Sequence, residues 1–109
     1  MANPKRTGLR HRTRTKLGER ANRTGADFLR IDSEIALTFS DIALHASDPQ
    51  RRSRSTATAR RAYETILRLR KDIELSHAET DKLDANLKRL KTELEDLGQR
   101  SRQEIPFKA

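Results

Sequence analysis

The residues best suited to chemistry are two histidines that each stand four positions from an aspartate. Asp41 precedes His45, and His77 precedes Asp81, so each pair would share one face of a helix. Imidazole nitrogen and carboxylate oxygen are ordinary zinc ligands, and the two pairs together would supply enough of them for a metal site. The helices predicted from the sequence, however, hold His45 and His77 at opposite ends of the molecule. We therefore expect no metal site within one chain.

The rest of the sequence lacks the groups of residues that catalytic sites need. The chain has no cysteine, and its four glycines do not form a phosphate-binding loop. The carboxylates fall on faces that we expect to be polar, where burial would not shift their pKa values. We predict that the protein is not an enzyme, binds no cofactor and takes no small-molecule substrate.

The composition favours a small helical domain that is only marginally stable alone. Apolar residues make up 33% of the chain and charged residues 37%, so the core is small, which favours a homo-oligomer or a protein partner. No apolar run approaches the ~18–20 residues that a membrane-spanning helix requires. The lack of cysteine suits a reducing compartment. We expect a cytoplasmic protein with no membrane partner.

Apolar residues recur at spacings of three and four in three successive segments, which is the period of an amphipathic α-helix. The segments cover residues 27–46, 49–73 and 76–97. The first segment carries Phe28, Ile31, Ile35, Phe39, Ile42 and Ala46. The third segment carries Leu83, Leu87, Leu90, Leu94 and Leu97. The sequence thus predicts an all-α protein, folded as an up-down-up three-helix bundle.

Two short signals mark the joins between these helices. Ser47 or Asp48 can cap the second helix, and Pro49 suits its first turn because proline lacks the N–H that a helix interior needs. Ser76 and Glu79 form a capping box at the start of the third helix. No glycine or proline separates the second segment from the third, so the alternative is a helical hairpin in which both are one long helix.

Charge divides the chain into three parts. Residues 1–26 hold eight Lys or Arg and one acid, without hydrophobic period, and we predict a disordered basic arm. The helical bundle occupies residues 27–98, with Asp27 as its first cap and Gly98 as its last. Residues 99–109 form a flexible C-terminal tail. The net charge of +8 therefore belongs mainly to the arm.

Charged residues with heptad spacing suggest how the first two helices pair. The first helix carries three acids and the second carries three arginines, each set spaced by seven positions. In an antiparallel hairpin, each acid lies level with one arginine. We predict three ion pairs: Asp27 with Arg68, Glu34 with Arg61, and Asp41 with Arg54. Exposed pairs contribute about 0–1 kcal/mol each, so this ladder would set register more than stability.

The five leucines of the third helix admit two interpretations. We favour the third side of the internal core, because about two and a half heptads is short for an autonomous coiled coil. The alternative is a seam for a partner or a second copy. Apolar side chains left over on the first helix, such as Leu29, Leu37 and Leu44, could also supply a dimer contact.

Basic residues in the arm and at the start of the second helix are candidate contacts for a polyanion. The arm has no Phe, Tyr or Trp on which bases could stack, so binding would be independent of sequence. The candidates are Lys5, Arg6, Arg10, Arg12, Arg14, Lys16, Arg20, Arg23, Arg51, Arg52 and Arg60.

Two functions fit these observations. The first is a small non-enzymatic helical interaction or adaptor protein that can self-associate. The second is an accessory nucleic-acid-binding protein that contacts phosphates through the basic arm.

Overall fold

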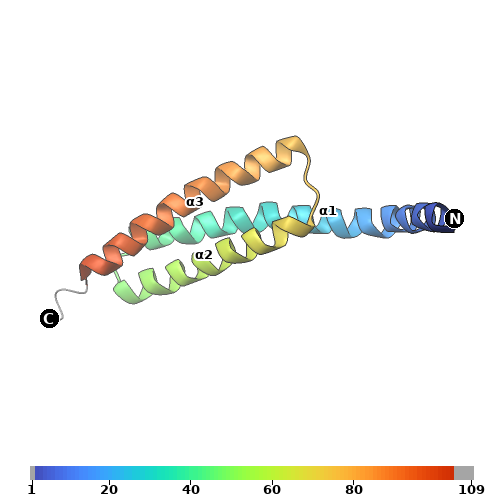
Figure 1. Cartoon of the computed structure of the whole chain (residues 1–109). Coiled ribbons are helices and arrows are strands. Elements are labelled where there is room, and N and C mark those ends of the chain that lie inside the picture. The colour runs from blue at the N-terminus through green and yellow to red at the C-terminus, as the bar shows by residue number, and fades with distance from the viewer. Residues whose placement is uncertain (1, 105–109) are drawn as a thin grey trace.

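The computed structural model describes the backbone of residues 2–104 and the side chains of residues 18–102. Within this part the chain forms helices and no strand: α1 (Ala2–His45), α2 (Pro49–Leu69), the short 3-10 helix η1 (Arg70–Asp72) and α3 (His77–Glu104). In Figure 1, α1 and α3 run in one direction and α2 runs in the opposite direction, with α1 lying between the other two helices. The predicted all-α, up-down-up three-helix bundle is confirmed.

The join between α1 and α2 forms as the sequence predicts. The carboxylate of Asp48 accepts a hydrogen bond from the backbone N–H of Gln50 at 3.1 Å, which caps α2. Pro49 occupies the first turn, where its missing N–H costs nothing. The chain therefore reverses within a few residues, and α2 packs antiparallel to α1.

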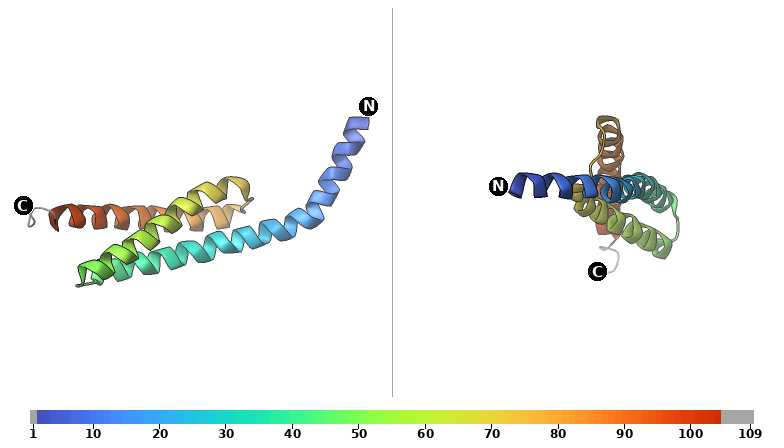
Figure 2. Two further views of the ribbon diagram at one scale, coloured as in Figure 1. Left: turned by 90° about the horizontal axis from the view of Figure 1, so that it is seen from below. Right: turned by 90° about the vertical axis from the view of Figure 1, so that its right-hand side faces the viewer.

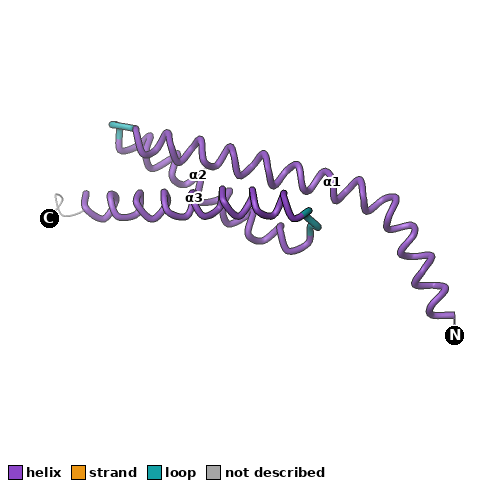
Figure 3. Tube along the Cα trace, turned by 90° about the horizontal axis from the view of Figure 1, so that it is seen from above, coloured by secondary structure: helices purple, strands orange, loops and turns teal. Residues whose placement is uncertain are grey.

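The join between α2 and α3 is a true break, so the alternative of one long helix is wrong. Ile73 is extended, with φ −121° and ψ 129°. The predicted capping box then starts α3: the Ser76 N–H donates to Glu79 at 2.8 Å, and the Glu79 N–H donates to the Ser76 hydroxyl at 3.1 Å. Figure 3 shows these two joins as short loops at opposite ends of the bundle.

The folded part begins earlier than the predicted cap at Asp27. The Asn22 amide donates to the Glu74 carbonyl at 2.8 Å and accepts from the Glu74 N–H at 2.7 Å, so it clamps the extended linker to α1. Gly25 makes room for Ile73, and Ala26 is buried. The prediction of disorder is therefore wrong for residues 18–26. The prediction relied on hydrophobic periodicity, which these residues lack. They are ordered instead by contacts with the linker between α2 and α3.

The outer part of the basic arm lies apart from the bundle. The backbone of α1 continues to Ala2, and Figures 1 and 2 show this end projecting beyond α2 and α3 and curving away from them. Among the described side chains, Asn22 is the first along the chain that hydrogen-bonds to the linker. Disorder of the arm in isolation stays a prediction.

At the other end, α3 does not stop at Gly98. It runs to Glu104, and Gly98 does not adopt a positive φ, which a C-terminal glycine cap would need. Arg100 holds the added turn, because its guanidinium donates to the Leu44 carbonyl at 3.0 Å and pairs with Asp96 at 3.5 Å. Residues 99–104 are thus helical rather than a flexible tail, and residues 105–109 lie outside the described residues.

All five leucines of α3 are buried, so their interpretation as the third side of the internal core is confirmed. They pack in two adjoining clusters. One cluster contains Leu90, Leu94 and Leu97 with Ala36 and Ala59, and the other contains Leu83 and Leu87 with Leu29 and Ile66. Leu29 and Leu37, which we expected to be left over on the surface, belong to this core.

The face of α1 that enters the core is not the one with the largest apolar side chains. Besides Leu29 and Leu37, the buried positions are small: Ala26, Ser33, Ala36, Ser40 and Ala43. Small residues on α2, including Ser55 and Ala59, are buried as well. Small side chains let helix backbones approach closely, and that contact leaves no room for Phe or Ile. Phe28, Ile31, Ile35 and Ile42 therefore point outward.

Candidate interaction surfaces

Polar pairs at constant offset fix α3 on α1. The Asn86 amide donates to the Ser33 hydroxyl at 3.0 Å, and the Ser40 hydroxyl hydrogen-bonds to Glu93. Both pairs join residues 53 positions apart, and the second lies seven positions after the first. A constant difference in residue number is the signature of parallel helices, so these buried serines specify the register of α3 on α1.

A charged ladder borders the same contact, but it is not the predicted one. Lys82 lies 3.9 Å from Glu34, and Arg89 lies 3.3 Å from Asp41. The predicted partners Arg61 and Arg54 make no ion pair with these acids among the described residues. The heptad-spaced acids therefore face α3 rather than α2.

The third predicted pair is also absent, since neither Asp27 nor Arg68 forms an ion pair within residues 18–102. The physical reason is the direction of the side chains. α2 presents Ala59 and Ile66 to the core, and residues two and five positions away from Ala59 on the helix point to the opposite side. The α2 ladder residues are consequently exposed.

The most conspicuous apolar surface is a line of exposed side chains on α1. Phe28 is 43% exposed, Ile31 44%, Ile35 45% and Ile42 41%, and we call these four residues the α1 stripe. Phe39 lies beside them and is only partly exposed, because it also touches the core. Four large apolar side chains in one line form the kind of patch that soluble monomers rarely leave uncovered.

The α1 stripe lies on a longer heptad seam. Exposed residues follow one another at alternate spacings of three and four: Ala21, Thr24, Phe28, Ile31, Ile35, Thr38 and Ile42. This spacing is that of the a and d positions of a coiled coil, and it keeps all seven residues on one side of the helix. Neither α2 nor α3 covers this side.

Carboxylates border the α1 stripe on both sides. Asp27, Glu34 and Asp41 each precede a seam residue, and Asp32 lies on the edge toward α2. Asp32 is partly buried, and this desolvation raises its pKa above the usual value of 3.8. Two of the other acids already have cations nearby, Lys82 for Glu34 and Arg89 for Asp41.

The second distinctive surface is the outer face of α2, which is strongly basic. The helix contains six arginines and a single acid, Glu64. Arg54, Arg61 and Arg68 are exposed and follow one another every seven positions. Arg51 and Arg60 are exposed as well.

The structure separates the sequence-predicted polyanion contacts from one another. Arg20 and Arg23 are exposed on α1 near the linker, where Arg23 helps to lower the pKa of Glu79. Arg52 instead has a local role, because its guanidinium donates to the Ala46 carbonyl at 2.9 Å at the end of α1. The side chains of Lys5, Arg6, Arg10, Arg12, Arg14 and Lys16 lie outside the described ones.

The two Asp/His pairs remain local contacts. His77 lies 3.4 Å from Asp81, and the His45 ring hydrogen-bonds to the Asp41 carbonyl at 2.8 Å. Across the side chains from residue 18 to residue 102, no three His, Cys, Asp or Glu residues are grouped so that they could hold a metal ion.

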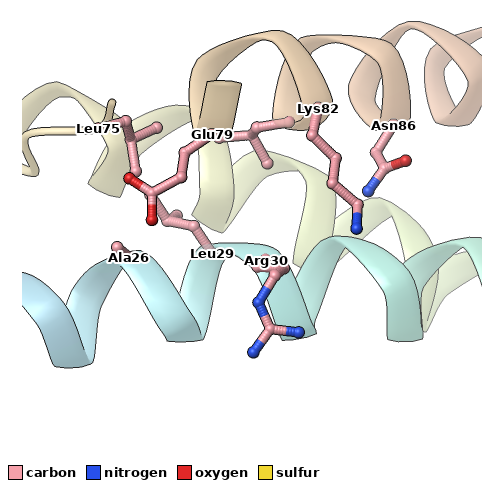
Figure 4. Close-up of a pocket in the computed structure, with 8 residues that line it drawn as sticks. Ala26, Leu29, Arg30, Leu75, Glu79, Lys82 and Asn86 are labelled. Carbon is pink, nitrogen blue, oxygen red and sulfur yellow. The ribbon is translucent and has the colours of Figure 1, made fainter. Parts of the chain in front are cut away.

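The best-formed cavity is too small for a substrate. Figure 4 shows it between α1 and the start of α3, with Lys82 and Asn86 reaching down from α3 toward α1. Its volume is about 50 Å³, and Leu29, Leu75 and Leu83 contribute apolar walls. Ligand pockets usually measure about 300–1,000 Å³, so this space suits a few water molecules at most.

A larger space is an open surface groove rather than a pocket. It lies where the linker after η1 crosses α1, and its volume is about 1000 Å³. Acids and arginines alternate along it, among them Glu19, Arg20, Arg23 and Asp72. The Asn22–Glu74 clamp occupies its floor, so the groove follows from the way the linker is attached.

No helix within residues 2–104 combines the length and the apolarity that crossing a bilayer requires. Comparison with protein-family models, with curated proteins and with solved structures finds no match.

Proposed function

We propose that the protein is a non-catalytic helical interaction protein that pairs with a second copy of itself through the α1 stripe. One observation carries the proposal: the core is complete without Phe28, Ile31, Ile35 and Ile42, yet these side chains form one exposed line. Burial of apolar surface contributes roughly 25 cal/mol per Å² removed from water. Packing a second helix along this line would therefore stabilise the pair substantially.

The order of residue sizes along the seam supports a second copy as the occupant. In an antiparallel pair of α1 helices, placing Ile31 level with Ile35 of the second copy also places Phe28 level with Thr38, and Ile42 level with Thr24. Phe28 and Ile42 then each meet a threonine, and two Ile31–Ile35 pairs lie at the centre. An interface in which one patch is complementary to itself is the usual basis of twofold dimers.

The charges beside the stripe are compatible with this pairing. Two copies bring the acidic borders of their stripes together, which would be unfavourable if all the carboxylates were uncompensated. Glu34 and Asp41 are already paired with Lys82 and Arg89 of the same chain. This local compensation lowers the electrostatic cost, and the remaining repulsion predicts tighter association at higher salt.

The size of the bundle supports the proposal further. A domain of about 100 residues with 37% charged residues has a small core, and pairing adds apolar burial that the monomer lacks. The absence of cysteine means that no disulfide supplies the missing stability. It also suits the reducing environment of the cytoplasm, where we place the protein.

Sedimentation equilibrium on the full chain and two variants tests the proposal. We expect the wild type to be a dimer at concentrations of about 10–100 μM, a range that corresponds to moderate affinity. The double variant Ile31→Gln with Ile35→Gln should be a monomer with unchanged helix content by circular dichroism, since both residues are exposed in the single chain. Leu67→Gln is the matched control, because Leu67 is 38% exposed but lies on α2.

A monomeric wild type at the highest concentration would overturn the proposal. So would equal weakening of the dimer by the α1 double variant and by Leu67→Gln, because the contact would then not be specific to the stripe. Increased thermal stability of the double variant at every protein concentration would also count against it, since a dimer interface must lose stability when its apolar residues become polar.

A further inference from the structure

The outer face of α2 is strongly basic, and the proposed self-association does not use it. Six arginines and one glutamate give this helix a net charge of +5. Arg51 and Arg52 add to the positive end of the helix dipole at its start, whereas Arg68 lies in the last turn, where the dipole favours a cation.

Three of these arginines form a straight line, which we call the arginine track: Arg54, Arg61 and Arg68. Each is exposed, and none forms an ion pair with the side chains described for residues 18–102. Residues seven positions apart on a helix lie about 10.5 Å apart along its axis, so the track is about 21 Å long. It points away from the buried residues Ala59 and Ile66, and hence away from α1.

Most side chains between the arginines are short. Ala57, Thr58 and Thr65 lie on this side of α2, together with one acid, Glu64, between Arg61 and Arg68. A flat helical surface with regularly spaced guanidinium groups can approach a polyanion closely. Guanidinium binds phosphate through two parallel hydrogen bonds, which makes arginine the residue best suited to that contact.

We propose that the arginine track binds the phosphate backbone of a nucleic-acid duplex. A duplex presents a rigid and regular array of charge, with one phosphate per ~3.4 Å of each strand, and a rigid helix with charges at fixed intervals can follow it. Single strands are usually held by aromatic stacking, and α2 contributes only Tyr63, which packs on the core. The contacts proposed for the track are to phosphates alone, so binding is independent of sequence.

Other anionic partners fit this surface less well. A membrane-binding helix inserts large apolar side chains beside its basic residues, whereas the residues in line with the arginine track are alanine, threonine and one acid, Glu64. An acidic protein partner would also gain from an apolar anchor at the centre of the contact, which this face does not supply. Contacts made of charge alone are typical of binding to nucleic-acid backbones.

Fluorescence anisotropy with the full chain and a labelled 20-bp DNA duplex tests the inference across a salt series. Replacing Arg54, Arg61 and Arg68 together by Gln should weaken binding at low salt by at least about tenfold and lower the slope of log K against log salt by about two to three. The matched control replaces Lys88, Lys91 and Arg102 by Gln. These exposed cations of α3 carry the same total charge but lie on another helix.

Retention of the wild-type slope by the control supports a contact at the track. Equal loss in both triple variants would overturn the inference, because the duplex would then respond only to net charge. Unchanged binding in the Arg variant would overturn it as well, since the contacts would lie in the arm. Poly-L-glutamate serves as the second probe: if the Arg variant loses affinity for this polypeptide and keeps its affinity for the duplex, the track serves an acidic protein instead.

Discussion

Two carboxylates show how the surroundings of single residues give the bundle opposite responses to pH. Burial disfavours the charged form of Asp32 and raises its pKa. Glu79 accepts a hydrogen bond from the Ser76 backbone N–H, and this bond lowers its pKa below the usual 4.5. The folded state therefore favours protonation at Asp32 and ionisation at Glu79, and each preference becomes a pH-dependent contribution to stability.

Replacing Asp32 by Asn should make the bundle more stable at neutral pH. The folded-state pKa of Asp32 is raised, so the wild type gains stability as the pH falls through that value, and the gain is complete below the unfolded value of 3.8. Asn is neutral at every pH, so the advantage of the variant should vanish in acid. Urea denaturation at about pH 7 and about pH 3 measures both effects.

Glu79→Gln provides a control of opposite sign. The stabilisation from Glu79 is present above its unfolded value of 4.5 and is lost as the pH falls through the lowered folded-state pKa. This variant should be less stable than the wild type at neutral pH and equal to it in acid. A shift of the same sign in both variants would contradict these assignments.

Two helical glycines differ in the space around their Cα atoms. Gly98 lies inside α3, and the nearest atom that an added Cβ would meet is in the Arg102 side chain at 3.9 Å. Gly25 lies inside α1, where an added Cβ would come within 2.7 Å of the Ile73 side chain. One glycine is thus free to change, whereas the other is needed for the linker to pack against α1.

Gly98→Ala should stabilise the bundle by about 1 kcal/mol, because alanine loses less backbone entropy than glycine when a helix forms. Gly25→Ala should give a smaller gain or a loss, since the helical preference is offset by the contact with Ile73. Urea denaturation of the two variants measures the difference. Equal gains at both positions would mean that Ile73 moves aside without cost.

At the scale of the whole molecule, α1 does three things along its length. Its N-terminal end carries the basic arm, its middle holds the linker through Asn22, and its C-terminal half packs between α2 and α3. The molecule is consequently elongated, with extents of 71 × 25 × 19 Å. The arm and the bundle are joined by one continuous helix, α1. An N-terminal truncation therefore removes only the arm, or also contacts of the bundle, depending on the residue at which it ends.

A chain that begins at Gly18 should unfold at the same urea concentration as the full protein, because it keeps every described contact between α1 and the linker. A chain that begins at Asp27 loses the two Asn22 hydrogen bonds, the Gly25–Ile73 packing and the burial of Ala26. We expect a loss of about 1–3 kcal/mol, which is typical of two such bonds and one small buried side chain. Equal stability of both shortened chains would contradict the assigned boundary.

The number of helices and the two joins between them could be predicted from the sequence, since they depend on local order. The apolar period located three helices, and Pro49 and the Ser76–Glu79 box located both joins. The Asn22–Glu74 clamp could not be predicted, because its partners stand 52 positions apart and carry no local signal. The early start of the folded part was missed for that reason.

The orientation of α1 was harder to predict, because this helix has two apolar faces. The face with Phe28 and Ile31 is the more hydrophobic, but the face with Ala36 and Ser40 allows the closer approach of α2. The charges left the pairing equally undecided. Acids spaced by seven can pair with the arginines of the antiparallel helix α2, where the two residue numbers have a constant sum. They can equally pair with Lys82 and Arg89 of the parallel helix α3, where the two numbers have a constant difference. The packing of the core selects the pairs with α3.

The pairing of α1 with α3 also fixes an order of assembly. α2 follows α1 after a turn of three residues, so their contact closes a short loop, whereas α3 meets α1 through residues 48 to 56 positions apart. Closing a longer loop costs more entropy, so the two short-loop hairpins, α1–α2 and α2–α3, precede the contact between α1 and α3. Until α3 is made, Leu29 and Leu37 lack the α3 leucines of their clusters, and the α1 stripe is exposed. A nascent chain paused before residue 77 is therefore the species of this protein most prone to aggregation.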